Sequence, residues 1–146
     1  MSADAIHASN APEPVGAYPH ARRVGDLLFL AGVGPRRRGS KQIPGVVLNP
    51  DGSIQTYDVE AQVRSCFANV KAVLDESGSG WDHIVDVLVF LTDMKRDFAA
   101  YNRVWAEYFP AGSNQPTRTT IEIGALPHGG NAPIAFEVKV IATIAR

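Results

Sequence analysis

The sequence predicts a single α+β domain in which two helices cover one face of a mixed or antiparallel sheet. Two segments have the 3.6-residue apolar period of amphipathic helices, and several others have the alternation or the β-branched composition of strands. With 146 residues, of which 45% are hydrophobic, the chain can bury the core of one ordinary domain. We therefore expect residues 1–146 to form one unit, with residues 1–12 as a loose N-terminus.

The first half of the chain favours strands followed by a helix. Residues 21–24 and 27–31 are expected to be strands joined by a tight Gly25-Asp26 turn. Residues 34–52 are rich in Arg, Gly, Pro and Asn, which predicts a long loop with one short strand at 46–48. An apolar stripe from Val59 to Leu74 then predicts a helix, with Asp58 as its cap and Gly78 near its end.

The second half predicts the centre of the sheet and its partners. Residues 85–91 (VDVLVFL) are nearly continuously apolar, which is typical of a strand buried on both faces. A second amphipathic helix is expected over residues 97–109, where Pro110 stops it, followed by strands at 118–126 and 134–144. Two helices can cover only one face of such a sheet. We expect another subunit to cover the other face, which makes the protein a homo-oligomer.

The last two strands are expected to pair as a hairpin and to carry the polar residues of the sheet. Alternation, with positions 126 and 133 adjacent at the turn, places five of these residues on one face: Arg118, Thr120, Glu122, Glu137 and Lys139. In this register Glu122 lies opposite Glu137, and a diagonal contact between Glu122 and Lys139 accounts for the lysine.

Two of these residues have the chemistry of a site. Arg118, at a strand end, can bind a carboxylate through two parallel hydrogen bonds, although an arginine at this place in a strand is more often an ordinary surface or ion-pair residue. Glu137, between apolar neighbours, can be partly desolvated and act as a proton shuttle, or it can pair with a nearby cation. Cys66 lies on the buried stripe of its helix and is expected to belong to the core.

Composition argues against several classes of function. The 14 basic and 15 acidic side chains nearly cancel, and no basic stripe interleaved with aromatics indicates a nucleic-acid partner. Residues 1–12 lack the features of a secretion signal, and no stretch approaches the roughly 18 apolar residues of a membrane span, so we expect a cytoplasmic protein. The four histidines have no metal-ligand spacing, and no phosphate-binding glycine motif is present, so no metal or cofactor is expected.

Four segments resemble the RidA/YjgF family of reactive-intermediate deaminases. They are PTRTTIEIGAL at 116–126, FEVKVIA at 136–142, the opening VGAYPHARRVGDLLFLAGVGP, and FLTDMKRDFAAYNRVWAEYF around the second helix. The resemblance spans roughly residues 10–142. It implies a fold like that of the trimeric α+β chorismate mutase, and a homotrimer whose active sites lie in clefts between subunits.

The resemblance also implies roles for single residues. Arg118 corresponds to the arginine that holds the substrate carboxylate, Glu137 to the glutamate that activates water, and Tyr18 to a tyrosine that lines the pocket. Thr120 stands where many members have a cysteine, which argues against a thiol role, and Asn102 is expected to be structural. In the hairpin register Arg118 and Glu137 of one chain are about 13 Å apart. Arg118 of one subunit must then meet Glu137 of another.

Within this family the basic opening and the long turn at 127–133 resemble the 2-aminomuconate deaminases of bacterial aromatic degradation. The expected reaction is hydrolysis of the imine tautomer of 2-aminomuconate to 4-oxalocrotonate and ammonia, without a cofactor. That substrate has two carboxylates, so a second cationic or hydrogen-bonding group is required, and the candidates are His20, Arg22, Arg36, Arg37, Arg38 and Lys41.

Three alternatives remain open at this point. Residues 36–38 can be a solvated loop with no part in binding. The protein can be a general 2-imino acid deaminase that uses the same arginine and glutamate. It can also be a non-catalytic regulator that binds a small molecule, a reading that ammonia release by the purified protein would exclude.

Overall fold

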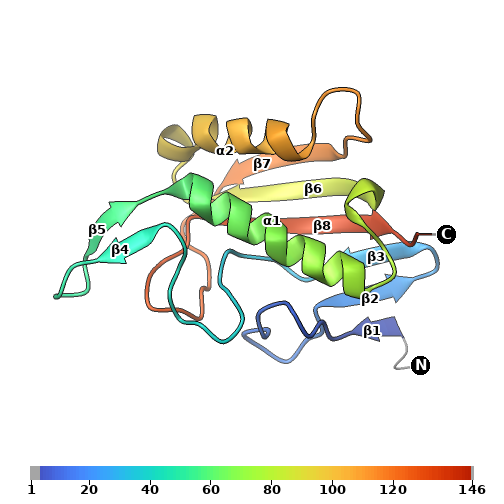
Figure 1. The fold of residues 1–146 in the computed structure, drawn as a ribbon, viewed down its shortest axis with the longest axis horizontal. Coiled ribbons are helices and arrows are strands. Elements are labelled where there is room, and N and C mark those ends of the chain that lie inside the picture. The colour runs from blue at the N-terminus through green and yellow to red at the C-terminus, as the bar shows by residue number, and fades with distance from the viewer. Residues whose placement is uncertain (1–3, 146) are drawn as a thin grey trace.

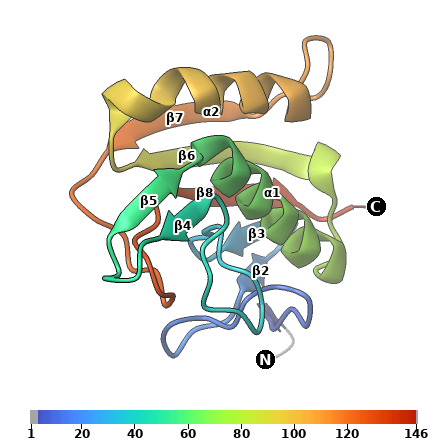
Figure 2. The ribbon, with the colours of Figure 1, turned by 60° about the vertical axis from the view of Figure 1, so that its left-hand side comes forward.

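The computed structural model describes residues 4–145, and it has one six-stranded mixed sheet with both long helices on the same face (Figures 1 and 2). The strand order is β1-β2-β3-β8-β6-β7, and a separate two-stranded sheet consists of β4 and β5. The expected α+β architecture is confirmed. The elements, in chain order, are β1 Ala5–Ile6, β2 Ala21–Val24, β3 Leu27–Leu30, β4 Val46–Leu48, β5 Ile54–Tyr57, α1 Val59–Glu76, β6 Ile84–Leu91, α2 Met94–Tyr108, β7 Thr117–Glu122 and β8 Phe136–Thr143.

The expected hairpin between the last two strands is wrong, because β6 lies between them. β6 pairs in parallel with β7 on one side and antiparallel with β8 on the other. β6, α2 and β7 form a strand–helix–strand unit, whose crossover helix brings the second strand back parallel to the first. Residues 123–135 then carry the chain past the end of β6 to β8. The continuous apolar character of β6 suits this central place, with a neighbour on each edge.

The side chains of β7 and β8 therefore do not share one polar face, which corrects the second part of that expectation. On β8, Phe136 and Val138 are buried under the helices, so Glu137 and Lys139 point to the opposite face. On β7, Arg118 points toward α2, where its guanidinium carbon lies over an aromatic ring of that helix. Arg118 and Glu137 thus lie on opposite faces of the sheet.

The expected contact between Glu122 and Lys139 is also wrong. The Glu122 carboxylate accepts a hydrogen bond of 2.8 Å from the backbone N–H of Met94, the first residue of α2. Lys139 donates to the carbonyl of Leu30 on β3, and burial lowers the pKa of its amine. Glu122 therefore stabilises the positive end of the α2 dipole.

Both helices begin at aspartate caps, as short polar side chains favour. Asp58 accepts hydrogen bonds from the N–H groups of Glu60 and Ala61 and so caps α1, as expected. α2 begins at Met94, three residues earlier than expected, because Asp93 accepts from the N–H of Arg96 and provides the cap. The first turn of α2 is mostly polar. The apolar stripe in the sequence therefore indicates only the later turns of the helix, and the predicted start was too late.

The segment before residue 13 is attached to the domain, in contrast to the loose N-terminus that we expected. β1 pairs with β2, and Ala8 and Ala11 are buried in the main core. The Glu76 carboxylate at the end of α1 accepts hydrogen bonds from the backbone N–H groups of Ser9 and Asn10. Residues 4–12 are therefore held against the domain. Residues 1–3 lie outside the described part.

One face of the sheet carries no helix in the part of the chain that the structure describes (Figure 2). Val87 and Val89 of β6 are buried under the helices, whereas Leu88 and Phe90 of the same strand are only half-buried on the other face. Ile121 on the neighbouring strand is 38% exposed. The apolar side chains of β6 thus pack under the helices on one face of the sheet. On the other face they form part of an apolar surface that no described helix covers. No described helix is both long and apolar enough to cross a membrane.

Candidate active site

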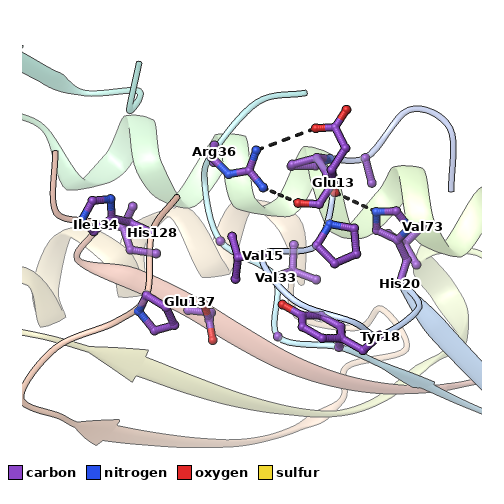
Figure 3. Close-up of a pocket in the computed structure, with 17 residues that line it drawn as sticks. Glu13, Val15, Tyr18, His20, Val33, Arg36, Val73, His128, Ile134 and Glu137 are labelled. Atoms are coloured by element: carbon purple, nitrogen blue, oxygen red, sulfur yellow. Dashed lines mark hydrogen bonds and ion pairs between the residues drawn. The ribbon is translucent and has the colours of Figure 1, made fainter. Parts of the chain in front are cut away.

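A cavity of about 180 Å³ opens where β3 and β8 run into the loops that follow and precede them (Figure 3). Its walls come from the N-terminal segment, residues 31–36 and the 127–134 loop. Four of the expected site residues line it, namely Tyr18, His20, Arg36 and Glu137, and two further ionisable residues, Glu13 and His128, join them. We call this cavity the Glu137 pocket.

Glu137 is the titratable group on the floor of the pocket. Burial raises the pKa of its carboxyl, and across residues 4–145 no group donates a hydrogen bond to it. Gly32, two residues after the end of β3, lies beside it, and a Cβ atom there would lie 2.6 Å from Oε2 of Glu137. A side chain at position 32 would displace this carboxylate, which faces the cavity partly desolvated and without a hydrogen-bond donor among the described residues. Such a group can accept a proton more readily than an exposed carboxylate does.

Arg36 is the cation of the pocket. Its side chain is 16% exposed, it donates to the backbone carbonyl of Glu13, and it lies 3.9 Å from a carboxylate oxygen of the same residue. Arg38 also pairs with Glu13, at 3.4 Å, and donates to the carbonyl of Ala11. The two arginines fix the N-terminal segment against the loop, and only Arg36 reaches the cavity.

His20 lines the pocket, but backbone groups occupy both of its ring nitrogens. Nδ1 accepts a hydrogen bond of 2.9 Å from the N–H of Ala8, which leaves the proton on Nε2 to be donated to the carbonyl of Pro12 at 2.7 Å. An imidazole used in this way has no donor or acceptor left for a ligand. The structure therefore gives His20 the role of holding the 8–12 segment, instead of the substrate contact that we expected.

We expect His20→Ala to destabilise the protein by about 1–2 kcal/mol, because two partly buried backbone groups lose their partner. Urea unfolding measures this loss, and faster amide exchange at Ala8 locates it. The exposed His7 provides the control, since His7→Ala removes no such bond. Unchanged exchange at Ala8 would contradict the holding role.

The other expected cations lie outside the pocket. Arg22 is exposed on β2, and Lys41 is exposed in the loop before β4, where its backbone carbonyl accepts from the N–H of Asn131. Arg37 and Arg38 line a separate groove between this loop and α1. Of the six candidates for a second cationic or hydrogen-bonding contact, Arg36 is the one whose side chain is placed to make it.

Arg118 and Thr120 lie together on the α2 side of β7. The guanidinium carbon of Arg118 is 4.9 Å from the ring centroid of Trp105 and 5.1 Å from that of Tyr101, and Nη1 donates to Oδ1 of Asn102 at 2.9 Å. Thr120 and Tyr101 share a hydrogen bond of 2.6 Å between their hydroxyl groups. Asn102, which we expected to be structural, thus orients Arg118.

Arg118 and Glu137 of one chain cannot contact the same small molecule. Val87 pairs with Arg118 on one side and with Val140 on the other, so Glu137 lies two strands across from Arg118 and three residues along. At the usual spacing and rise this is on the order of 14 Å, and the side chains point to opposite faces. The separation is close to the one that we expected, although the register from which we obtained it is wrong.

Sequence reasoning missed Glu13, Gly32 and His128 as pocket residues. A signal was available for His128, because it is the ionisable residue of the long 127–133 turn that resembles the 2-aminomuconate deaminases. None was available for Glu13 or Gly32, whose positions depend on how the N-terminal segment and β3 meet. Within residues 4–145 no group of three or more His, Cys, Asp or Glu side chains is placed to hold a metal ion.

Comparison with known proteins agrees with this architecture. Residues 8–144 match the family described as Endoribonuclease L-PSP. A RutC family protein of Pyrococcus abyssi is 36% identical over 97% of this chain and 98% of its own length, and protein HMF1 of Saccharomyces cerevisiae is 32% identical over 91% and 88%. Among solved structures, the YjgF gene product of E. coli has a TM-score of 0.77 at 27% identity over 95% and 97%, and E. coli TdcF with bound serine has 0.78 at 27% over 97% and 98%.

The fold and the pocket define a small α+β protein with a partly buried carboxylate in a ligand-sized cavity. The chain belongs to the Endoribonuclease L-PSP family, with RutC and YjgF proteins among its relatives. The RidA/YjgF resemblance is thereby confirmed at the level of the family.

Proposed function

We propose that the protein is an imine and enamine deaminase that hydrolyses 2-imino acids, and that its particular substrate is 2-aminomuconate. The observation that carries the proposal is the Glu137 carboxylate, which is partly desolvated, has a raised pKa and faces the cavity without a protein partner. This is the state required of a group that accepts a proton from water and returns it during the reaction. A related E. coli structure contains serine, whose carboxylate and amine resemble the reacting end of such a substrate.

The proposed reaction begins with the imine tautomer, which forms when the enamine is protonated at carbon. Glu137 takes a proton from water as the oxygen attacks the C=N carbon, and the tetrahedral carbinolamine forms. Glu137 then returns the proton to nitrogen, and as the C–N bond breaks the carboxylate accepts the proton of the carbinolamine hydroxyl, so that a 2-oxo acid and ammonia leave and this proton ends on the ammonia as ammonium. The imine is already electrophilic, so positioning and one proton relay are enough, and no cofactor enters the balance.

The proposed site is shared between subunits of a homotrimer. The apolar sheet face without a helix, which includes Leu88 and Phe90, is the surface expected to pack against another copy. Arg118 lies on the edge strand β7, so it can reach the Glu137 pocket of a neighbouring subunit while remaining far from its own. It would hold the carboxylate next to the imine carbon and draw electrons from that carbon.

The position of Arg36 supports the proposal that the substrate is 2-aminomuconate and not a monocarboxylic imino acid. A substrate whose first carboxylate binds Arg118 has its second carboxylate at the other end of the molecule, and Arg36 is the pocket cation that remains for it. The second candidate is a general 2-imino acid deaminase, which needs only Arg118 and Glu137. Comparing kcat/KM for 2-aminomuconate and 2-iminobutyrate separates the two, since the general enzyme would not prefer the dicarboxylate.

Ammonia release tests the proposal, and Arg118 provides the decisive variant. We expect Arg118→Ala to lower kcat/KM by an amount equivalent to about 2–5 kcal/mol, because a carboxylate anchor in a partly dry cleft is lost. Arg118→Lys keeps the charge but cannot make two parallel hydrogen bonds, so its kcat/KM should lie between the values of the wild type and of Arg118→Ala. Arg103→Ala, an exposed arginine of α2 paired with Glu60, is the matched control.

Near-normal kcat/KM in Arg118→Ala would remove this residue from the site. If purified wild-type protein releases no ammonia above the spontaneous rate from either imine, the chain is a non-catalytic binder and the proposed reaction is wrong.

A further inference from the structure

We propose that Arg36 and His128 together form a subsite for a second, distal carboxylate, so that the pocket selects dicarboxylic ligands. The inference rests on the proposed function and extends it by naming the group that recognises the far end of the substrate. Both side chains line the Glu137 pocket and come from separate loops, residues 31–36 and 127–134 (Figure 3).

The backbone fixes the tautomer of His128. The N–H of Gly130 donates to Nδ1 of His128 at 3.1 Å, so this nitrogen is an acceptor and the proton of the neutral imidazole is on Nε2. The Nε2–H group is then a donor with no acceptor among the residues that the structure describes. A half-buried donor on the wall of a cavity is available to an acceptor of the ligand, and a carboxylate oxygen provides one.

Close backbone contacts hold His128 near Arg36. Gly129 has φ +63°, and a Cβ atom there would lie 2.8 Å from Val15 and 3.3 Å from Nε of Arg36. At Gly130 a Cβ atom would lie 2.6 Å from the side chain of Ile43. The two glycines therefore let the 127–131 segment lie directly against the loop that carries Arg36, so that His128 and Arg36 line the same pocket from adjacent loops.

The charge of Arg36 is only weakly neutralised by protein. Its ion pair with Glu13 is long, at 3.9 Å, and Glu13 is 54% exposed, so solvent screens the interaction. A ligand carboxylate in the less solvated cavity would interact with the same guanidinium more strongly. Arg36 supplies the charge and His128 a directed hydrogen bond, a combination that favours a carboxylate over an apolar chain end.

Two substitutions of His128 separate its Nε2 donor from its role in the loop. Asparagine keeps an acceptor near the position of Nδ1 for the N–H of Gly130 but has no group at the position of Nε2. Glutamine places an N–H near the position of Nε2. We expect His128→Asn to lose selectivity and His128→Gln to keep most of it, with His7→Asn as the exposed control.

Matched ligands make the test specific. Amino-acid oxidases generate 2-iminoadipate and 2-iminohexanoate in situ, which have the same six-carbon chain with and without the distal carboxylate. The measurement is the loss of semicarbazone when semicarbazide competes with the enzyme for the free imine. We expect wild type to favour the dicarboxylate at least tenfold in kcat/KM, and His128→Asn and Arg36→Met each to reduce this ratio about tenfold, mainly through KM.

Calorimetric binding of the unreactive acids adipate and hexanoate provides a readout that does not depend on catalysis. We expect adipate to bind more tightly and to lose that advantage in His128→Asn and Arg36→Met. Equal affinity of wild type for both acids, or equal losses for both acids in His128→Asn, would overturn the subsite. If the subsite is overturned but the protein releases ammonia from 2-iminohexanoate, the proposed deaminase function still stands. If adipate binds selectively but no ammonia is released, the proposed function is refuted and the subsite still stands.

Discussion

Glu137→Gln is expected to lower kcat by about 10²–10⁴-fold while KM changes much less. The amide has the shape of the carboxylate and fits beside Gly32, but it cannot take a proton from water or return one to the leaving nitrogen. In the wild type, the rate should fall as pH decreases through the raised pKa of Glu137, since only the carboxylate accepts the proton. Steady-state kinetics from pH 4 to pH 8 measure both effects.

Glu137→Gln should not weaken the fold, and the pH dependence of stability shows why. The pKa of the Glu137 carboxyl is raised above its ordinary value of 4.5 by burial, so the folded state binds the proton more tightly than the unfolded state. The contribution of this group to stability is therefore greatest below pH 4.5 and falls as pH rises through the raised pKa. The Tm of Glu137→Gln relative to that of wild type should consequently increase between pH 4 and pH 7.

Glu122→Gln is the matched control for this prediction. Glu122 accepts from the N–H of Met94 at the start of α2, so its substitution should lower Tm slightly with little effect on kcat. If Glu137→Gln retains a normal kcat, or loses activity only in proportion to a loss of folded protein, Glu137 is structural and the proposed proton relay is wrong.

Inactive Arg118→Ala and Glu137→Gln subunits are expected to restore activity when they are unfolded and refolded together. The two residues are on the order of 14 Å apart within one chain and on opposite faces, so the proposed site takes Arg118 from one subunit and Glu137 from another. A hybrid interface is intact when the Glu137→Gln subunit provides Arg118 and the Arg118→Ala subunit provides Glu137.

The size of the recovery is fixed by the assembly. In an equal, random mixture each of the two required subunits is present at its place with probability one half, so about a quarter of the sites are intact in a ring of identical interfaces. Ammonia release should return to roughly a quarter of the wild-type rate, and native mass spectrometry verifies that hybrid trimers are present. Mixtures that contain hybrid trimers and remain as inactive as either parent would rule out sites shared between subunits.

Much of the local structure followed from the sequence. The apolar stripes and Asp58 indicated where α1 lies, and the β-branched run from residue 85 to residue 91 identified the strand with a neighbour on each edge. These features depend on periodicity and on capping, which are properties of adjacent residues. The segments around Arg118 and Glu137 also indicated the family, and the family match over residues 8–144 includes both.

The tertiary structure alone decided which strands are neighbours and what each pocket residue does. A period of two tells which side chains share a face within one strand, but it does not tell which strand lies alongside, and β6 separates the two strands that we had paired. The roles of the ionisable residues depend on partners distant in sequence: Ala8 and Pro12 occupy both nitrogens of His20, whereas Gly130 leaves Nε2 of His128 free to donate. Sequence therefore determined the elements and the family of this protein. The packing of loops against the sheet determined which of its many cations line the Glu137 pocket, because that choice depends on contacts between segments far apart in the chain.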